Sequence, residues 1–294
     1  MFQRVFAFGF AVVSAVQAFG ASPMPGNASA SSESTKPQLR NGPITIVVDP
    51  EVGGRIASMT HEGSEILKTT RDENNWHWGS TVWVAPQSDW RWPPSTALDS
   101  EPYTVIASDD SRIIMRSRRD PDTGFQLTKR IRIKPNAKSP TFEMTYTLDN
   151  GSDETKRVAL WENTRVNWKG STRFAKGTEI RTSNSEKSAV VTETAESLTI
   201  RFDEKQPDGQ KLFCTPPVKG DSKWIWNSYR LGDLILTKSR IAPAQVAPKQ
   251  APLEIYFGKD AGFAELEFQG PYEELEPGES ASFTVIWRLK SVKK

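Results

Sequence analysis

The feature that most constrains the fold is a long succession of short alternating segments separated by turn residues. β-Branched and aromatic residues alternate with polar ones, and clusters of Gly, Pro, Asn, Asp and Ser interrupt them. Alternation with a period of two places one set of side chains on a core face, and no stretch shows the period of an amphipathic helix. Turns at this spacing are typical of antiparallel strands that follow one another along the chain.

The predicted strands extend almost to the C-terminal end. The turn at 49–54 joins the first two, and the alternation is clearest at 125–133, where Phe125, Leu127 and Ile131 share one face. The predicted strands are 44–48, 55–59, 103–107, 112–116, 125–133, 141–148, 157–166, 197–202, 231–239, 253–257, 263–269 and 280–289. Because strands do not alternate with helices, the sequence predicts an all-β fold, a large antiparallel β-sandwich of two sheets packed face to face.

The first residues have the pattern of a secretory signal peptide. A basic residue precedes the apolar run FAFGFAVVSAV, and small residues follow. We therefore expect residues 1–18 to be a signal peptide and residues 19–43, rich in Ser, Ala, Pro and Gly, to be a disordered tail. No apolar run is long enough to span a bilayer as a helix. The expectation is a secreted or periplasmic protein with no membrane anchor, whose single domain covers residues 44–289.

The charges of the chain are nearly balanced, with 38 basic and 36 acidic side chains, and no basic stripe runs along the sequence. Because phosphate binding needs clustered positive charge, we expect no nucleic-acid partner. The single Cys214 cannot form an internal disulfide, and we interpret it as a half-buried small apolar residue rather than a catalytic thiol. No metal site and no cofactor are predicted, and the sequence leaves the oligomeric state open.

The stretch at 76–94, WHWGSTVWVAPQSDWRWPP, holds five of the ten tryptophans. Its prolines and polar breaks predict a strand that leads into an irregular loop. The rings could fill the core, which we favour for Trp83 in the apolar run TVWVA, or they could line a cleft. Trp90 and Trp92, in a proline-flanked loop, are the better cleft candidates, and Trp78 is a further candidate for ligand contact.

Four sequence motifs resemble those of the galactose-mutarotase-like (aldose 1-epimerase-like) superfamily. They are GGRIASMTHEGSEIL, GSTVWVAPQSDWRWPP, VALWENTRV and EIYFGKDAGFAELEFQGPYEELEPGES. The chain is most similar to an uncharacterised exported branch of that superfamily, and the resemblance covers Ile44 to Leu289. It implies the large sandwich, or supersandwich, of the galactose-mutarotase type and a carbohydrate as ligand.

The resemblance also implies a candidate catalytic base. Aldose 1-epimerases use a glutamate to accept the proton of the anomeric hydroxyl and a histidine to protonate the ring oxygen. The family's Leu-Glu-x-Gln motif is matched at residues 266–269, which makes Glu267 the candidate base. Alternation places Glu265 and Glu267 together on the face opposite Leu266 and Phe268, where Glu265 is a candidate for substrate contact. A solvated strand face is the alternative interpretation.

The acid of the family has no direct counterpart in this sequence. The position that matches best is Trp161, whose indole cannot donate a transferable proton at neutral pH, so we assign it to substrate contact. His77, between two tryptophans at the start of the aromatic stretch, is the histidine to which we assign a catalytic role. His61 lies in a turn and is interpreted as facing solvent.

Two further polar residues have open interpretations. Glu162 could replace the histidine as the acid, because burial raises the pKa of a carboxyl, or it could form an ion pair with Arg157 or Arg165. Arg55, in the motif GGRI, is either a strand residue beside a glycine turn or a clamp that contacts the substrate.

Three functions are compatible with these residues. The first is a carbohydrate-active enzyme of the aldose 1-epimerase type, with Glu267 as base. The second is a non-catalytic sugar-binding module that has lost the acid, since stacking rings and hydrogen-bonding edges suffice for recognition. The third is a domain related to polysaccharide lyases or hydrolases. The missing histidine favours the second and the retained Leu-Glu-x-Gln motif favours the first, while the sugar and its linkage stay open.

Overall fold

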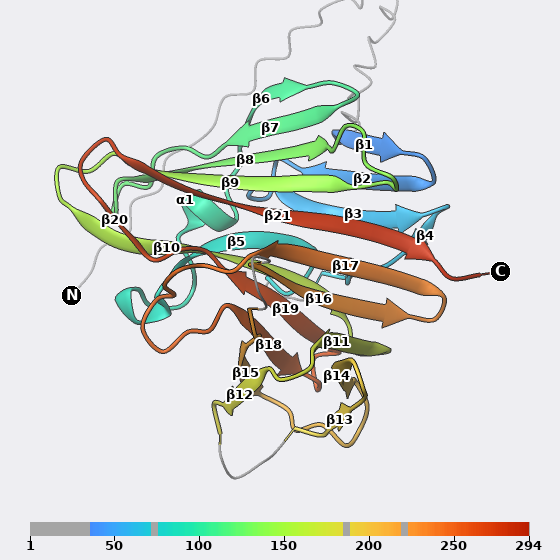
Figure 1. Cartoon of the computed structure of the whole chain (residues 1–294). Helices are drawn as coiled ribbons and strands as arrows, with labels where there is room; N and C mark the ends of the chain where they lie inside the picture. Colours follow the sequence, from blue (N-terminus) through green and yellow to red (C-terminus); the bar gives the residue numbers. More distant parts are fainter. Residues whose placement is uncertain (1–35, 72–75, 185–188, 219–222, 294) are drawn as a thin grey trace, which may run out of the picture. The chain divides into compact units, whose positions relative to one another are not determined.

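The computed structural model describes residues 36–71, 76–184, 189–218 and 223–293 (Figure 1). Within these residues the strands form an eleven-stranded and a ten-stranded antiparallel sheet, joined by loops that carry two short helices, η1 (Gln87–Asp89) and α1 (Thr96–Asp99). The all-β prediction is confirmed. No helix in this part of the chain has the length and apolarity needed to cross a membrane.

The eleven-stranded sheet runs, in spatial order, through β1 (Gln38–Asn41), β2 (Ile44–Asp49), β3 (Arg55–His61), β5 (Ser80–Ala85), β10 (Lys156–Asn167), β19 (Phe263–Gln269), β18 (Leu253–Gly258), β15 (Gln210–Thr215) and β12 (Glu179–Thr182), with β4 (Ser64–Glu65) paired to β3 and β20 (Glu273–Leu275) paired to β10. The ten-stranded sheet runs through β13 (Val191–Glu193), β14 (Ser197–Arg201), β11 (Ser171–Ala175), β16 (Trp224–Leu231), β17 (Leu234–Ile241), β21 (Ser280–Ser291), β9 (Phe142–Asn150), β8 (Phe125–Ile133), β7 (Arg112–Arg116) and β6 (Thr104–Ser108).

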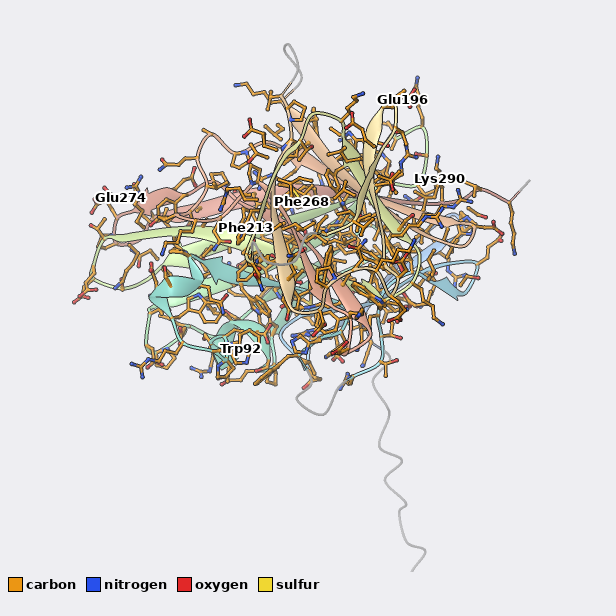
Figure 2. The ribbon with its side chains drawn as sticks, turned by 90° about the horizontal axis from the view of Figure 1, so that it is seen from below. Trp92, Glu196, Phe213, Phe268, Glu274 and Lys290 are labelled. Atoms are coloured by element: carbon orange, nitrogen blue, oxygen red, sulfur yellow. The ribbon has the colours of Figure 1, made fainter. Side chains whose placement is uncertain are left out.

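The alternation of each strand determines which side chains enter the core between the sheets. In β21, Phe283, Val285 and Trp287 are buried, whereas Thr284 and Arg288 on the other face are exposed. In Figure 2, Phe268 lies near the middle of the view among many side chains, while Glu274 and Lys290 lie at the periphery. One continuous apolar cluster with members from both sheets therefore holds the sandwich together.

Several predicted boundaries differ from the structure. Residues 38–41, which the sequence places in the tail, form β1 because Leu39 is fully buried and the segment pairs with β2. The remainder of the predicted tail up to residue 35 and the predicted signal peptide lie outside the described residues. The predicted strand 231–239 is divided between β16 and β17, because the chain reverses after Leu231. Cys214 is fully buried rather than half-buried, and burial raises the pKa of its thiol.

A buried ion pair connects the two sheets. Lys238 Nζ on β17 lies 2.7 Å from Glu162 Oε2 on β10, and the Trp287 indole donates a hydrogen bond to Glu162 Oε1 at 3.1 Å. Lys238 also donates hydrogen bonds to Thr164 Oγ1 and to the Leu266 carbonyl, each at 2.8 Å. Burial lowers the pKa of Lys238 and raises the pKa of Glu162, and their attraction offsets part of both shifts. Removing one partner leaves the other charge buried alone.

Lys238→Met is therefore expected to lower the free energy of unfolding by about 3–5 kcal/mol. The double variant Lys238→Met/Glu162→Gln should recover part of the loss, because no unpaired charge remains in the core. Urea denaturation measures both, with Lys290→Met at an exposed position of β21 as the matched control. A loss in Lys238→Met no larger than in this control contradicts the role assigned to the pair.

Candidate functional site

The eleven-stranded sheet has a second face, on the side away from the ten-stranded sheet, that is rich in polar and aromatic groups. Cross-strand register brings Glu267 opposite Asn163 and Glu265 opposite Arg165, and the neighbouring strands extend the row. We call this the polar face. Its members are Thr81, Trp83, Trp161, Asn163, Arg165, Lys211, Phe213, Glu254, Tyr256, Glu265, Glu267 and Gln269.

The polar face is covered and not solvated. Alternation correctly places Glu265 and Glu267 opposite Leu266 and Phe268, yet Glu267 has no exposed surface and Glu265 is 7% exposed. A second apolar cluster, which includes Ala247 of the segment before β18, covers part of this face. The interpretation as a solvated strand face is therefore wrong, because loops far away in sequence close over the strands.

Glu267 makes its contacts through one oxygen. Its Oε2 accepts a hydrogen bond from the Trp161 indole at 2.6 Å and lies 2.8 Å from Lys211 Nζ. Its Oε1 is buried and makes no hydrogen bond with any described residue. Burial raises the pKa of Glu267 to about 8; Lys211 opposes this shift, while Glu265 and Glu254 add to it. The protonated form of Glu267 is thus favoured relative to that of an exposed carboxyl.

Lys211 is a member of the site that sequence reasoning missed. Its Nζ lies 2.7 Å from Glu254 Oε2 as well as near Glu267, and it lies 4.2 Å from the centre of the Trp161 ring. Burial alone would lower the pKa of Lys211, but the two carboxylates outweigh burial and raise it. The only signal in the sequence was the alternation in QKLFCT, which places Lys211 on the face of the strand opposite to the face that carries the buried Leu212.

Glu265 forms the other half of the charged cluster. Arg165 Nε donates to Glu265 Oε1 at 2.8 Å, and the Arg165 guanidinium lies 4.6 Å from the centre of the Trp83 ring. Burial would raise the pKa of Glu265, but Arg165, Lys211 and His77 together hold it below its ordinary value. Glu254, Glu265 and Glu267 therefore lie in one buried cluster with Arg165 and Lys211.

His77 reaches this end of the polar face from the aromatic stretch. Its ring stacks on Phe263 with centroids 4.7 Å apart and an interplanar angle of 15°, and it contributes to the lowered pKa of Glu265. Phe263 is two residues from Glu265 on β19, so the structure brings His77 close to one of the candidate residues.

A chain of indoles connects the surface with Glu267. Trp92, which is 42% exposed, contacts Trp83 edge to face at 5.5 Å, and Trp83 contacts Trp161 in the same way at 5.1 Å. Trp90 is half-buried, and its indole donates to the Val84 carbonyl at 3.0 Å. Trp83 is buried, as the sequence predicted, but it belongs to the polar face and not to the core between the sheets.

Arg55 and Trp78 hold the aromatic stretch in place and do not line its surface. Arg55 is fully buried and donates to both carboxylate oxygens of Asp99 and to the carbonyls of Trp76 and Trp78. Trp78 is 2% exposed and lies beneath the guanidinium groups of Arg55 and Arg71. Burial lowers the pKa of Arg55 to about 10. These two side chains therefore position the loop: Arg55 is the strand residue beside a glycine turn, one of its two interpretations, and the ligand contact expected of Trp78 is not seen.

Asp99 and a glycine turn complete this support. Asp99 Oδ1 accepts hydrogen bonds from Thr81 at 3.0 Å and from the Trp83 indole at 2.8 Å. Gly53 has φ +66°, and a Cβ at this position would lie 1.8 Å from the Asp99 carbonyl oxygen. Only glycine therefore allows α1 to approach the turn before Arg55 closely enough for the ion pair.

Glu162 lies on the opposite face of β10, in the core between the sheets, where it pairs with Lys238. It neighbours Trp161 in sequence, but adjacent residues of a strand point to opposite faces. The proposal that Glu162 shares a site with Glu267 is contradicted by this orientation.

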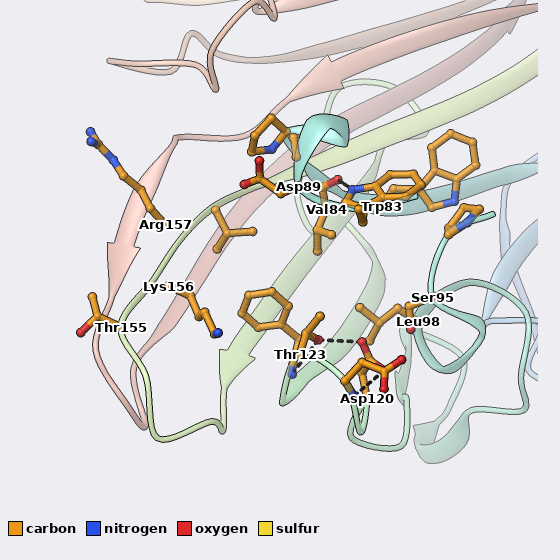
Figure 3. Close-up of a pocket in the computed structure, with 17 residues that line it drawn as sticks. Trp83, Val84, Asp89, Ser95, Leu98, Asp120, Thr123, Thr155, Lys156 and Arg157 are labelled. Atoms are coloured by element: carbon orange, nitrogen blue, oxygen red, sulfur yellow. Dashed lines mark hydrogen bonds between the residues drawn. The ribbon is translucent and has the colours of Figure 1, made fainter. Parts of the chain in front are cut away.

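A cavity of about 310 Å³ lies beside the aromatic loop (Figure 3). Its walls include Trp83, Trp90, Leu98, Phe125 and Lys156. Trp83 is thus shared between this cavity and the polar face. In the described part of the chain, no group of three or more His, Cys, Asp or Glu side chains is arranged to hold a metal ion.

Comparisons with solved structures show the fold of galactose mutarotase-like proteins. A galactose mutarotase-like protein from Lactobacillus casei matches with a TM-score of 0.60 and 11% identity over 86% of this chain and 99% of the other. A galactose mutarotase related enzyme from Lactobacillus acidophilus matches with a TM-score of 0.54 and 11% identity over 88% of this chain and 98% of the other. A galactose mutarotase-like protein from Clostridium acetobutylicum matches with a TM-score of 0.51 and 12% identity over 87% of this chain and 95% of the other. At these identities the likeness concerns the fold alone.

The chain belongs to the family described as a domain of unknown function (DUF4380), whose model matches residues 35–290. No curated protein matches the chain. The galactose-mutarotase type of sandwich predicted from the sequence is confirmed.

The raised pKa of Glu267 predicts a pH-dependent stability. Because its pKa in the folded protein, about 8, lies above that of an ordinary carboxyl, the wild type loses stability as the pH rises from about 5 to about 8. Glu267→Gln mimics the protonated form, so its free energy of unfolding should rise relative to that of the wild type by up to about 1.4 kcal/mol per pH unit. Urea denaturation across this range tests this, with the exposed Glu273→Gln as control. If the difference in free energy of unfolding between Glu267→Gln and the wild type stays constant with pH, the raised pKa of Glu267 is contradicted.

Proposed function

We propose that the protein binds a carbohydrate on the polar face of the eleven-stranded sheet. The observation that carries the proposal is a set of buried hydrogen-bonding atoms without partners beside the indoles of Trp83 and Trp161 on the same face. Glu267 Oε1, Gln269 Oε1 and the two terminal nitrogens of Arg165 make no hydrogen bond with any described residue. Buried groups of this kind are ordinarily paired, so a ligand with several hydroxyls would satisfy them.

The chemistry of the polar face suits a sugar ring. The apolar face of a pyranose packs against an indole such as Trp92 or Trp83, while its hydroxyls accept from Arg165 and pair with Glu267. A protonated Glu267 can donate through Oε1, and an ionised one can accept there. The galactose mutarotase-like fold supports a carbohydrate ligand, and the N-terminal pattern of residues 1–18 supports a place outside the cytoplasm.

Entry to the polar face requires its cover to move. Glu267 and Trp161 are buried, whereas Trp92 at the outer end of the indole chain is 42% exposed. Displacement of Trp92 and of the segment that carries Ala247 would open the face. Trp92 is therefore the first ring that an approaching sugar contacts.

Trp92→Ala is expected to weaken sugar binding by about threefold to tenfold, because one stacking ring is lost. The free energy of unfolding should fall by less than about 1.5 kcal/mol, since the ring is partly exposed. A glycan array of the protein without residues 1–18 identifies the ligand, and calorimetry gives the affinities. Trp224→Ala, which removes an indole of similar exposure from the ten-stranded sheet, is the matched control. Equal affinities for the two variants would rule out the role of Trp92.

Catalysis of the aldose 1-epimerase type, with Glu267 as base, is the second candidate function. The observation that favours it is the raised pKa of Glu267, because a carboxylate with a pKa near 8 is a stronger base than an ordinary one. It would accept the proton of the anomeric hydroxyl. His77 is the candidate for the acid, since Trp161 occupies the family's histidine position and Glu162 faces the core.

If this second function holds, the rate of anomer interconversion rises with pH up to about 8, as Glu267 ionises. Glu267→Gln should then slow the reaction by about 100-fold to 10,000-fold, because the amide has no basic lone pair. Polarimetry on freshly dissolved monosaccharides measures the rate, and Glu273→Gln is the control. A wild type that binds a sugar without accelerating its mutarotation excludes the epimerase and leaves the binding function.

A further inference from the structure

The outward face of the ten-stranded sheet gathers positive charge. Nine cationic side chains project from six of its strands onto this face, which we call the cationic face. They are Arg112, Arg116, Arg130, Arg132, Arg173, Arg201, Arg230, Arg288 and Lys290. Only two acidic residues, Glu143 and Asp149, occupy outward positions of the described strands of this sheet. The whole chain has a net charge of +2, so the charge is segregated to this side.

Cross-strand register spaces some of these cations regularly. One row of directly opposed residues runs through Lys290, Ile235, Arg230, Ser171 and Arg201, so a cation occurs on every second strand. Neighbouring strands are roughly 4.8 Å apart, which separates successive cations at their backbones by roughly 10 Å. Serine and threonine hydroxyls occupy many of the positions between. They are Thr128, Thr145, Thr147, Ser171, Thr199, Ser228, Thr237, Ser239, Ser282 and Thr284.

The cationic face has one half on β7, β8 and β9 and another on β21, β17, β16, β11 and β14. The two halves differ in the carboxylates that lie near their cations. Arg132 forms an ion pair with Glu143, which Lys134 also contacts. On the other half, Arg230 donates a hydrogen bond to the Gly232 carbonyl at 2.9 Å. In the described part of the chain, no carboxylate lies within ion-pair distance of the five cations on this half. These are Arg173, Arg201, Arg230, Arg288 and Lys290.

Hollows lie between these cations. One of about 500 Å³ is lined by Arg173, Thr199 and Arg201, with Glu196 also present. Another of about 510 Å³ is lined by Ser171, Arg201 and Arg230, with Asp203 also present. Arg201 is shared by both hollows, so they form neighbouring depressions along the row.

We infer that the cationic face binds an anionic polysaccharide. The planar fork of arginine pairs bidentately with carboxylate or sulfate groups, and eight of the nine cations are arginines. The intervening hydroxyls can exchange hydrogen bonds with those of a sugar chain. A spacing of roughly 10 Å is about the length of two linked rings of an extended polymer, so a chain with a carboxylate on each sugar can present one to each successive cation of the row.

A polysaccharide fits this face better than a nucleic acid. Binding of single strands relies on aromatic side chains that stack on successive bases, and binding of duplexes relies on an element that enters a groove. Among the described residues of this face the exposed or half-exposed indoles are Trp224 and Trp226, both on β16, and no helix projects from it. The cationic and polar faces point away from each other, so this inference does not depend on the proposed function.

Binding of the whole protein to polygalacturonate, measured by calorimetry at low and at higher salt, tests the inference. The triple variant Arg201→Ser/Arg230→Ser/Lys290→Ser removes one row of exposed cations and should bind about tenfold more weakly, with a shallower dependence on salt. The control Arg40→Ser/Arg91→Ser/Lys249→Ser removes the same charge from exposed positions off this face and should retain the wild-type affinity within about twofold. Neutral dextran should not bind to this face.

Three results would overturn the inference. The first is a triple variant that binds polygalacturonate as tightly as the wild type. The second is a control variant that loses as much affinity as the triple variant, which would mean that net charge alone is responsible. The third is a wild type that binds duplex DNA, at the same concentration of negative charge, at least as tightly as polygalacturonate.

Discussion

Burial of β10 on both faces is the constraint on which the rest of the structure depends. A strand covered on only one side can present its polar residues to water, but from Val158 to Val166 every residue of β10 is buried. Its polar side chains are therefore costly to bury unless they find partners within the protein on both sides. Glu162 finds Lys238 in the core between the sheets, and Arg165 finds Glu265 on the polar face. The cover over the polar face makes these interactions strong by excluding water.

Alternation within one strand was sufficient to predict part of the candidate site. It placed Glu265 and Glu267 on one face of β19, and it placed Trp83 in a strand. It could not predict that Lys211 of β15 lies beside Glu267, because this depends on the order of strands that are far apart in sequence. The cover was missed for the same reason, since irregular loops have no periodic pattern that indicates what they pack against.

The cationic face could not be predicted from the sequence either, because it depends on how distant strands are placed side by side. A count of basic and acidic residues gives near neutrality, and no run of the sequence is strongly basic. The cationic face becomes visible only when six strands are placed in register, because each contributes one or two arginines or lysines separated by buried apolar residues. Because every second residue of a strand belongs to the other face, the cations of one surface are never consecutive in the sequence and form no basic run.

The polar face is maintained at a cost to stability. A buried polar atom without a hydrogen bond costs about 1–3 kcal/mol, and Glu267, Gln269 and Arg165 each contribute at least one. Apolar side chains of similar volume would remove this cost, as they often do when they replace buried ion pairs. Packing alone therefore does not account for these residues. A ligand that supplies the missing partners would recover part of the cost on binding, and a polyhydroxylated ring beneath the indoles has the donors and acceptors to do so.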